Sequence, residues 1–330
     1  MDGILDEVTF RQVPTNGIEL RVATLGDGPL VLMVHGFPES WYSWRHQMKP
    51  IAELGFTAAA VDVRGYGGSD KPHPVEAYRL EEITADIAGV ADALGGGSAI
   101  LIGHDWGAPI VWNTALLHPE KIRGVAGLSV PYMPMGERSF IDVVRAAFTD
   151  RGRFFYQVYF QDEGVAEAEL EADVRASLRR FCYAISGDAP DGTWPVDKPH
   201  GAALLERLPD PDPFPAWLTE ADIDYYVAEF ERSGFRGPLN RYRNHGADHA
   251  FLRPHAKTPI VQPSLFIGGT RDLVLKMLPG VDMVAMMRPN LPGLRGARLL
   301  DGIGHWTQQE APDEVNELLT GWLKGFRAAE

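Results

Sequence analysis

The chain has 330 residues, 45% of them hydrophobic, and its 31 basic and 45 acidic side chains give a formal net charge of −14. This length is sufficient for one large α/β domain, or for a core domain with an inserted cap. The acidic balance excludes nucleic acids and anionic membranes as partners, because both are bound through basic patches that neutralise phosphate.

The single cysteine, Cys182, excludes an internal disulfide and a cysteine-rich metal site. Residues 1–7 are acidic and lack both the basic start and the apolar stretch of a signal peptide. No apolar run approaches the roughly 20 residues that a helix needs to cross a bilayer. We therefore expect a cytoplasmic protein with no membrane segment.

The first part of the chain alternates between strand patterns and helix patterns. Residues 8–25 indicate an antiparallel hairpin at one edge of a sheet. Short apolar runs that end in Gly, Asp or His then indicate buried parallel strands at residues 29–34, 57–63, 98–102 and 125–130. Helical patterns separate these strands at residues 41–54, 80–94 and 108–118. This alternation predicts a mainly parallel sheet with helices on both faces.

The alternation stops after Pro131, and strand patterns return only at residues 263–268 and 298–300. The residues between are helical and aromatic, with Pro-rich interruptions such as residues 208–215. An insertion this long inside one sheet is expected to be functional. We predict one α/β core, formed by residues 1–132 and 256–330, with a helical cap inserted at residues 133–255.

Residues 103–107 (GHDWG) lie where a predicted strand runs into a predicted helix. The glycines two positions before and two positions after Asp105 permit the sharp turn of a nucleophile elbow. That turn exposes the central side chain at the carboxyl end of the sheet. Most hydrolases carry Ser at this position, whereas this chain carries Asp. The five residues alone also fit an aspartate that caps the following helix.

Three other segments favour the catalytic interpretation. The segment HGFP, which contains Phe37, follows a strand at the place where this architecture puts one oxyanion-hole N–H, and Trp106 would supply the other. Asp272 follows the next-to-last strand, and His305 lies in the loop after the last strand. Because nucleophile, acid and histidine occur in the chain order of this fold, we predict a triad of Asp105, Asp272 and His305.

Longer motifs occur in both the core and the cap. The core motifs are residues 35–45 (HGFPESWYSWR), 62–69 (DVRGYGGS), 103–108 (GHDWGA) and 304–310 (GHWTQQE). The cap motifs are residues 156–170 (YQVYFQDEGVAEAEL), 217–226 and 230–243 (FERSGFRGPLNRYR). Over nearly the whole chain, these motifs resemble the soluble epoxide hydrolases of the α/β-hydrolase superfamily. The resemblance implies the α/β-hydrolase fold with an inserted helical lid, and conversion of epoxides and water to vicinal diols.

An aspartate nucleophile suits this reaction. A carboxylate that attacks an epoxide carbon forms an ester, which water can cleave, whereas a serine would form a stable ether. His305 would activate the water, and the N–H groups of Phe37 and Trp106 would stabilise the oxyanion. Asp272 would fix the His305 tautomer and stabilise the imidazolium. This chemistry requires no cofactor and no metal.

Epoxide opening also requires a proton donor near the ring oxygen. The resemblance implies Tyr156 and Tyr242 for this role. From the residues alone, Tyr159, Tyr225 and Tyr226 are equally eligible.

Glu39, in the segment HGFPE, resembles a family residue that helps to hold the hydrolytic water, and first-turn helix capping is the alternative. Residues 65–68 (GYGG) lack the third glycine of a dinucleotide-binding loop. His245, His249 and His255 lack metal-ligand spacing, so we expect them on the surface.

The cap departs from the family pattern at three places. Arg241 stands where members often have Trp, and residues 244–251 (NHGADHAF) lack a common Asn-Trp pair. Residues 162–163 (DE) replace a more usual acidic-proline pair. These departures leave the triad intact and concern lid shape and substrate preference.

Two other functions fit part of the pattern. A haloalkane dehalogenase also uses an elbow aspartate, and Trp106 suits its halide site, but Phe37 stands where such enzymes often have Asn. A ligand-binding protein that had lost turnover would be expected to lack a catalytic residue. We therefore predict an epoxide hydrolase whose partners are a small apolar epoxide and water, and the sequence leaves a monomer and a homodimer both open.

Overall fold

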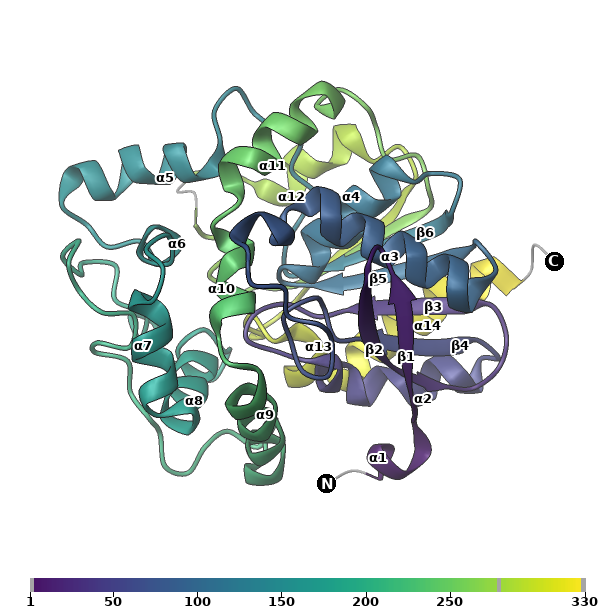
Figure 1. Cartoon of the computed structure of the whole chain (residues 1–330), viewed down its shortest axis with the longest axis horizontal. Helices are drawn as coiled ribbons and strands as arrows, with labels where there is room; N and C mark the ends of the chain where they lie inside the picture. The colour runs from purple at the N-terminus through teal and green to yellow at the C-terminus, as the bar shows by residue number, and fades with distance from the viewer. Residues whose placement is uncertain (1–2, 278–279, 328–330) are drawn as a thin grey trace.

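The computed structural model describes residues 3–277 and 280–327. An eight-stranded sheet forms the centre, with the strand order β1-β2-β4-β3-β5-β6-β7-β8 (Figure 1). The strands are β1 (Thr9–Thr15), β2 (Ile18–Leu25), β3 (Leu30–Val34), β4 (Thr57–Val61), β5 (Ala99–His104), β6 (Ile122–Leu128), β7 (Ser264–Gly269) and β8 (Leu294–Leu300).

The strand directions confirm the predicted sheet. β1 and β2 form the antiparallel hairpin at one edge, and β2 also pairs antiparallel with β4. From β4 to β8 all neighbouring strands are parallel. The predicted strand at residues 298–300 is only the end of β8, which begins at Leu294. β8 is an edge strand whose residues stay partly or fully exposed, so its apolar pattern is weak.

Helices cover the sheet in pairs. α3 (Leu80–Gly95) packs against α4 (Gly107–Leu117), and α2 (Arg45–Glu53) packs against α14 (Pro312–Arg327). The predicted helix at residues 41–54 is divided into the 3₁₀ turn η1 (Trp41–Trp44) and α2. Short helices α1 (Ile4–Glu7), α12 (Met283–Met287) and α13 (Thr307–Glu310) complete the core, with the 3₁₀ turns η2 (Val75–Tyr78) and η5 (Arg288–Asn290).

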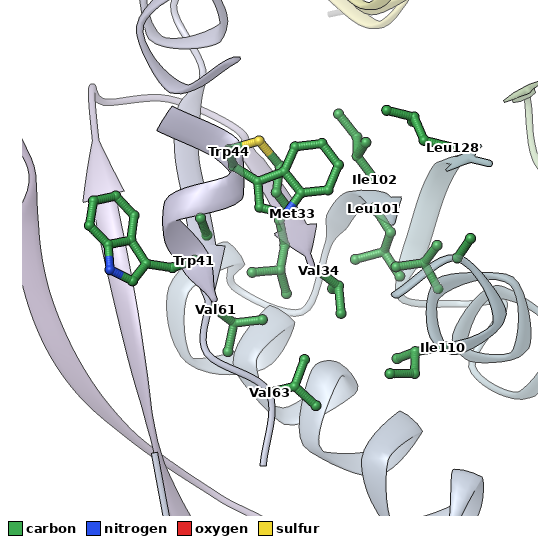
Figure 2. Close-up of a cluster of buried hydrophobic side chains, with 14 of the residues drawn as sticks. Met33, Val34, Trp41, Trp44, Val61, Val63, Leu101, Ile102, Ile110 and Leu128 are labelled. Atoms are coloured by element: carbon green, nitrogen blue, oxygen red, sulfur yellow. The ribbon is translucent and has the colours of Figure 1, made fainter. Parts of the chain in front are cut away.

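The centre of the core lies on both faces of β3, whose five residues are all buried. Figure 2 shows Met33 on the side of Trp44, and Val34 on the side of Ile110 from α4. This alternation follows from the two-residue period of a strand, and it requires apolar residues at every position of a strand covered on both faces.

Residues 129–263 lie between β6 and β7, which are neighbours in the sheet. This insertion contains α5 (Phe140–Ala147), η3 (Thr149–Arg151), α6 (Tyr156–Tyr159), α7 (Val165–Ala172), α8 (Val174–Ala184), α9 (Glu220–Ser233), α10 (Arg236–Tyr242), α11 (His245–Leu252) and η4 (Arg253–His255). Figure 1 shows α5 to α8 to one side of the sheet, beyond its strand ends. The exact cap limits, residues 133–255, stay a prediction.

Within residues 3–277 and 280–327, no helix combines the length and the apolar character that a membrane span requires.

Candidate active site

Asp105 lies on the sharp turn between β5 and α4. Its backbone φ is +50°, a left-handed conformation that costs energy for a residue with a side chain. A Cβ on Gly103 would lie 2.2 Å from the Gly107 oxygen, and a Cβ on Gly107 would lie 2.0 Å from the Val34 oxygen. The two glycines of the motif are therefore required by close backbone contacts, as a nucleophile elbow predicts.

The carboxylate of Asp105 contacts catalytic candidates on both oxygens. Phe37 N–H donates to Oδ1 at 2.8 Å, and His305 Nε2 lies 3.2 Å from Oδ2. A Cβ on Gly36 would lie 2.4 Å from Asp105 Cβ, so the HGFP segment can approach this closely only with glycine there. Trp106 is the N-cap residue of α4, and the helix has no side-chain cap at that position.

His305 connects Asp105 to Asp272, the predicted acid. Its Nδ1 lies 3.1 Å from Oδ1 and 3.3 Å from Oδ2 of Asp272, which is fully buried. Burial alone would lower the pKa of His305, but the facing carboxylates of Asp272 and Asp105 raise that pKa well above its ordinary value. Burial works to raise the pKa of Asp105, and His305 together with the Phe37 N–H holds it below its ordinary value.

Tyr156 of α6 and Tyr242 of α10 lie across from Asp105, on the cap side of the site. Their ring centroids are 6.1 Å apart, and both side chains line the cavity that contains Asp105. The Gln157 amide donates to the Tyr156 hydroxyl at 2.7 Å. Burial, and then the charge of Asp105, raises the pKa of both tyrosines above the ordinary value. Both hydroxyls therefore stay protonated at neutral pH.

The other candidate tyrosines are engaged elsewhere. Tyr159 donates to Glu169 at 2.8 Å, and Tyr225 accepts a hydrogen bond from Trp41 at 2.7 Å. Tyr226 donates to the Gln309 side chain at 3.2 Å. None of these three tyrosines is among the described residues that line the cavities next to Asp105. Of the five tyrosines, the structure thus brings only Tyr156 and Tyr242 to Asp105.

Glu39 is buried, and four protein groups bind its carboxylate. Oε2 contacts Gly36 N–H at 2.9 Å and His104 Nδ1 at 2.8 Å. Oε1 accepts from the side chains of Gln308 at 3.1 Å and Gln309 at 3.0 Å. Burial would raise the pKa of Glu39, but His104 and the Gly36 N–H hold it below the ordinary value.

His104 extends this network to the base, because its Nε2 lies 2.8 Å from the His305 backbone oxygen. The Glu39 network thus connects the oxyanion segment, the elbow and the His305 loop. First-turn capping therefore does not describe Glu39 fully, and its role in holding water stays a prediction.

Two cavities meet at Asp105. The larger has a volume of about 490 Å³ and the smaller about 210 Å³, and both are lined by Asp105, Tyr156, Val274 and Met277. The larger cavity has a mainly apolar lining that includes the aromatic side chains Phe37, Phe148, Phe154, Phe155, Phe181 and Trp194. Exposed Arg151, Arg153 and Lys276 also line it. There is therefore room for an apolar molecule on either side of Asp105.

The smaller cavity contains residues at which the cap departs from the family pattern, namely Arg241 and members of the segment 244–251. Buried Arg241 covers the Trp106 ring at 4.7 Å and forms an ion pair with buried Asp248. His245 lines the same cavity, and burial lowers its pKa to about 3, so the expectation of a surface histidine is wrong. The centroid of its ring lies 5.7 Å from that of Trp106, a contact that no residue spacing in the sequence indicates. Across the described part of the chain, no His, Cys, Asp and Glu side chains group as metal ligands would.

Comparison with known proteins agrees with the geometry. A family described as the alpha/beta hydrolase fold matches residues 29–308. Epoxide hydrolase A from Mycobacterium tuberculosis is 42% identical over 96% of this chain and 98% of its own length. Bifunctional epoxide hydrolase 2 from Rattus norvegicus is 39% identical over 93% of this chain, which corresponds to 54% of that protein.

Solved structures give the same result. An epoxide hydrolase from an endophytic Streptomyces superposes with a TM-score of 0.91 and 48% identity, over 98% of this chain and 97% of that one. Epoxide hydrolase A from Mycobacterium thermoresistibile gives a TM-score of 0.90 and 43% identity, over 96% and 98%. With this fold, this site and these relatives, the chain belongs to the soluble epoxide hydrolase family of the α/β-hydrolase superfamily.

Proposed function

We propose that this enzyme converts epoxides and water to vicinal diols through a covalent ester on Asp105. The observation that carries the proposal is the surroundings of one carboxylate. Asp105 has a backbone N–H on one oxygen, His305 on the other, and two protonated tyrosines across an apolar cavity. These groups support the proposal because they could serve as nucleophile, base and acid at one point.

In the first step, a carboxylate oxygen of Asp105 attacks an epoxide carbon, and the bond from that carbon to the ring oxygen breaks. Tyr156 and Tyr242 stabilise the leaving oxygen and supply its proton. The lowered pKa of Asp105 keeps the carboxylate ionised, which is the nucleophilic form. The raised pKa of both tyrosines keeps the donors protonated until the alkoxide forms.

In the second step, water attacks the ester carbonyl and gives its proton to His305. The bond from the carbonyl carbon to the substrate oxygen then breaks, that oxygen takes the proton from His305, and the diol leaves the regenerated Asp105 carboxylate. Ester formation removes the negative charge of Asp105, which is one of the groups that raise the pKa of His305. The pKa of His305 therefore falls once the ester exists, and the proton that the ring gives up replaces the one that the tyrosine lost in the first step. The neutral ring can then act as a base. Asp272 keeps the ring oriented, and the N–H groups of Phe37 and Trp106 stabilise the oxyanion.

A dehalogenase with the same nucleophile is the second candidate. Trp106 could contact a halide, because it follows Asp105 and borders the smaller cavity. A departing halide needs no proton, however, and this site has two tyrosines across from the nucleophile. The tyrosines favour an epoxide, whose oxygen leaves as a strong base. Halide release from a haloalkane, measured beside diol formation from styrene oxide, separates the two functions.

The covalent step is tested with His305→Gln and Asp105→Ala. The first variant should still form the ester and fail to hydrolyse it, so intact-protein mass spectrometry should find the protein heavier by one substrate. Asp105→Ala should form neither ester nor diol. Diol formation by Asp105→Ala would contradict the proposal, and so would the absence of any adduct in His305→Gln.

A further inference from the structure

The loop that carries His305 is held by Glu310. This carboxylate accepts N–H groups on both sides of the histidine, from Gly304 at 2.9 Å and from Trp306 at 3.0 Å. It also accepts the N–H of Gly187 at 2.8 Å, a cap residue that follows α8. One side chain therefore fixes the base loop and attaches it to the cap.

Backbone contacts reinforce this attachment. The N–H of His305 donates to the Ile185 oxygen at 3.0 Å, so the cap contacts the histidine itself. A Cβ on Gly304 would lie 2.2 Å from the Gly187 nitrogen, and only glycine permits that approach. The ring N–H of Trp306 donates to the oxygen of Cys182, the buried cysteine in α8, at 2.7 Å.

Arg271 makes the matching connection for the acid. It precedes Asp272, and its guanidinium donates to the oxygens of Gly187 at 2.6 Å and Ala189 at 2.7 Å. Its backbone N–H donates to the Ile303 oxygen at 2.9 Å, in the base loop. The loops of the base and of the acid are thus both bound to residues 185–189, which we name the cap bridge.

The nucleophile is held differently. Asp105 is fixed by β5, α4 and the HGFP segment, through the close contacts of Gly36, Gly103 and Gly107 with core backbone or with Asp105 itself. Core residues hold the elbow, and the His104 ring and the Ser129 hydroxyl also bind the backbone oxygen of His305. The backbone N–H groups of residues 304–306, in contrast, are bound by Glu310 and by the cap bridge. A displacement of the bridge would therefore disturb the position of His305 and leave that of Asp105 unchanged.

From this arrangement we propose that Glu310 and Arg271 are positioning residues for ester hydrolysis. They hold the loops that carry His305 and Asp272 against the cap bridge. The inference rests on the proposed function, because it assigns the residues to one of its two steps. Alkylation requires the Asp105 carboxylate and the cap tyrosines. Hydrolysis also requires His305 in position to take a proton from water, so it is the step that depends on the contacts of Glu310 and Arg271 with the cap bridge.

The test uses Glu310→Gln, which keeps the shape but places an NH₂ group against at least one backbone N–H donor. The full-length variant reacts with styrene oxide under rapid mixing, and mass spectrometry follows the ester on Asp105. We expect hydrolysis of the ester to slow by about tenfold or more. Alkylation should stay within about twofold of wild type, so kcat and KM fall together while kcat/KM changes little.

Arg271→Met should give the same pattern, and Arg271→Lys should restore part of the hydrolysis rate. Glu169→Gln is the matched control, because Glu169 also accepts two backbone N–H groups, from Leu204 and Leu205, wholly within the cap. It should leave the ratio of the two rate constants unchanged. Melting temperatures of all variants separate a loss of folding from a loss of one step.

The outcomes distinguish failure of the proposed function from failure of the positioning role of Glu310 and Arg271. If the wild-type enzyme neither forms an ester nor releases diol, the proposed function itself fails. If wild type turns over normally and Glu310→Gln slows both steps equally, Glu310 has only a structural role and the positioning proposal is overturned. Unchanged hydrolysis in Glu310→Gln would overturn it as well.

Discussion

The core side and the cap side of the active site are built in different ways. On the core side, backbone contacts too close for any side chain hold Asp105, and glycines mark these contacts in the sequence. On the cap side, aromatic packing and one buried ion pair hold Tyr156, Tyr242 and Arg241. Backbone contacts restrict which residues fit, whereas packed side chains can be exchanged in compensating sets. We therefore expect the core to determine ester formation and hydrolysis, and the cap to provide both the proton donors and the fit to substrate.

The largest effect expected on the cap side is loss of the proton donors. Positioned acid catalysis contributes about 10²- to 10⁴-fold in rate, and two tyrosines on one oxygen partly substitute for each other. Tyr156→Phe and Tyr242→Phe should each slow alkylation, and the double variant should be nearly inactive. Hydrolysis of a preformed ester should change far less. Stopped-flow measurement of both steps checks this, with Tyr159→Phe as the control.

One result would contradict the assignment of the proton donors: Tyr159→Phe or Tyr225→Phe slows alkylation, while Tyr156→Phe and Tyr242→Phe each react at the wild-type rate. The proton donors would then have been misassigned.

A second effect concerns stability in the cap. Arg241→Met leaves Asp248 buried without its partner, and breaking a buried ion pair costs about 3–5 kcal/mol of unfolding free energy. The double variant Arg241→Met/Asp248→Asn removes both charges and keeps the oxygen that accepts the Leu80 N–H. It should recover most of the lost stability. Urea unfolding of the four proteins in this cycle measures the coupling, and additive losses would show that the two departures are independent.

The smallest effect is expected at the rim of the larger cavity. Arg151, Arg153 and Lys276 predict that an epoxide with a distal carboxylate binds better than its neutral analogue. Exposed charge pairs contribute only about 0.2–1 kcal/mol, so replacing Lys276 with Gln should raise KM for the anionic epoxide by about 1.4-fold to fivefold. The effect should shrink at high salt and be absent for the neutral analogue. Equal changes in KM for both substrates would show that Lys276 does not attract the distal carboxylate.

The core could be predicted further than the cap for a physical reason. The elbow, the triad order and the parallel sheet leave local signals, because glycines and apolar strands are needed wherever backbones approach closely or are buried on both faces. The edge strand β8 left a weaker signal, since its residues are partly exposed.

Residues that act through distant partners gave no such signal. The pairing of Arg241 with Asp248 depends on how α10 and α11 pack, and neither residue indicates the other in the sequence. In the sequence, Glu310 is only the last residue of the motif at residues 304–310. Nothing there indicates that its side chain binds three backbone N–H groups. The prediction that Tyr156 and Tyr242 donate the proton rests on the family resemblance. The residues alone make five tyrosines eligible, and only the structure shows which hydroxyl groups are bound elsewhere.

The central claim is that Asp105, and not water, attacks the epoxide. A single turnover in water labelled with heavy oxygen, with enzyme in excess over styrene oxide, tests it most directly. The first diol should carry an unlabelled oxygen from Asp105, and the label should enter the Asp105 carboxylate, detected in the peptide that contains residues 103–107. Label in the first diol with none in Asp105 would mean that water opens the epoxide directly, and the covalent mechanism would be wrong.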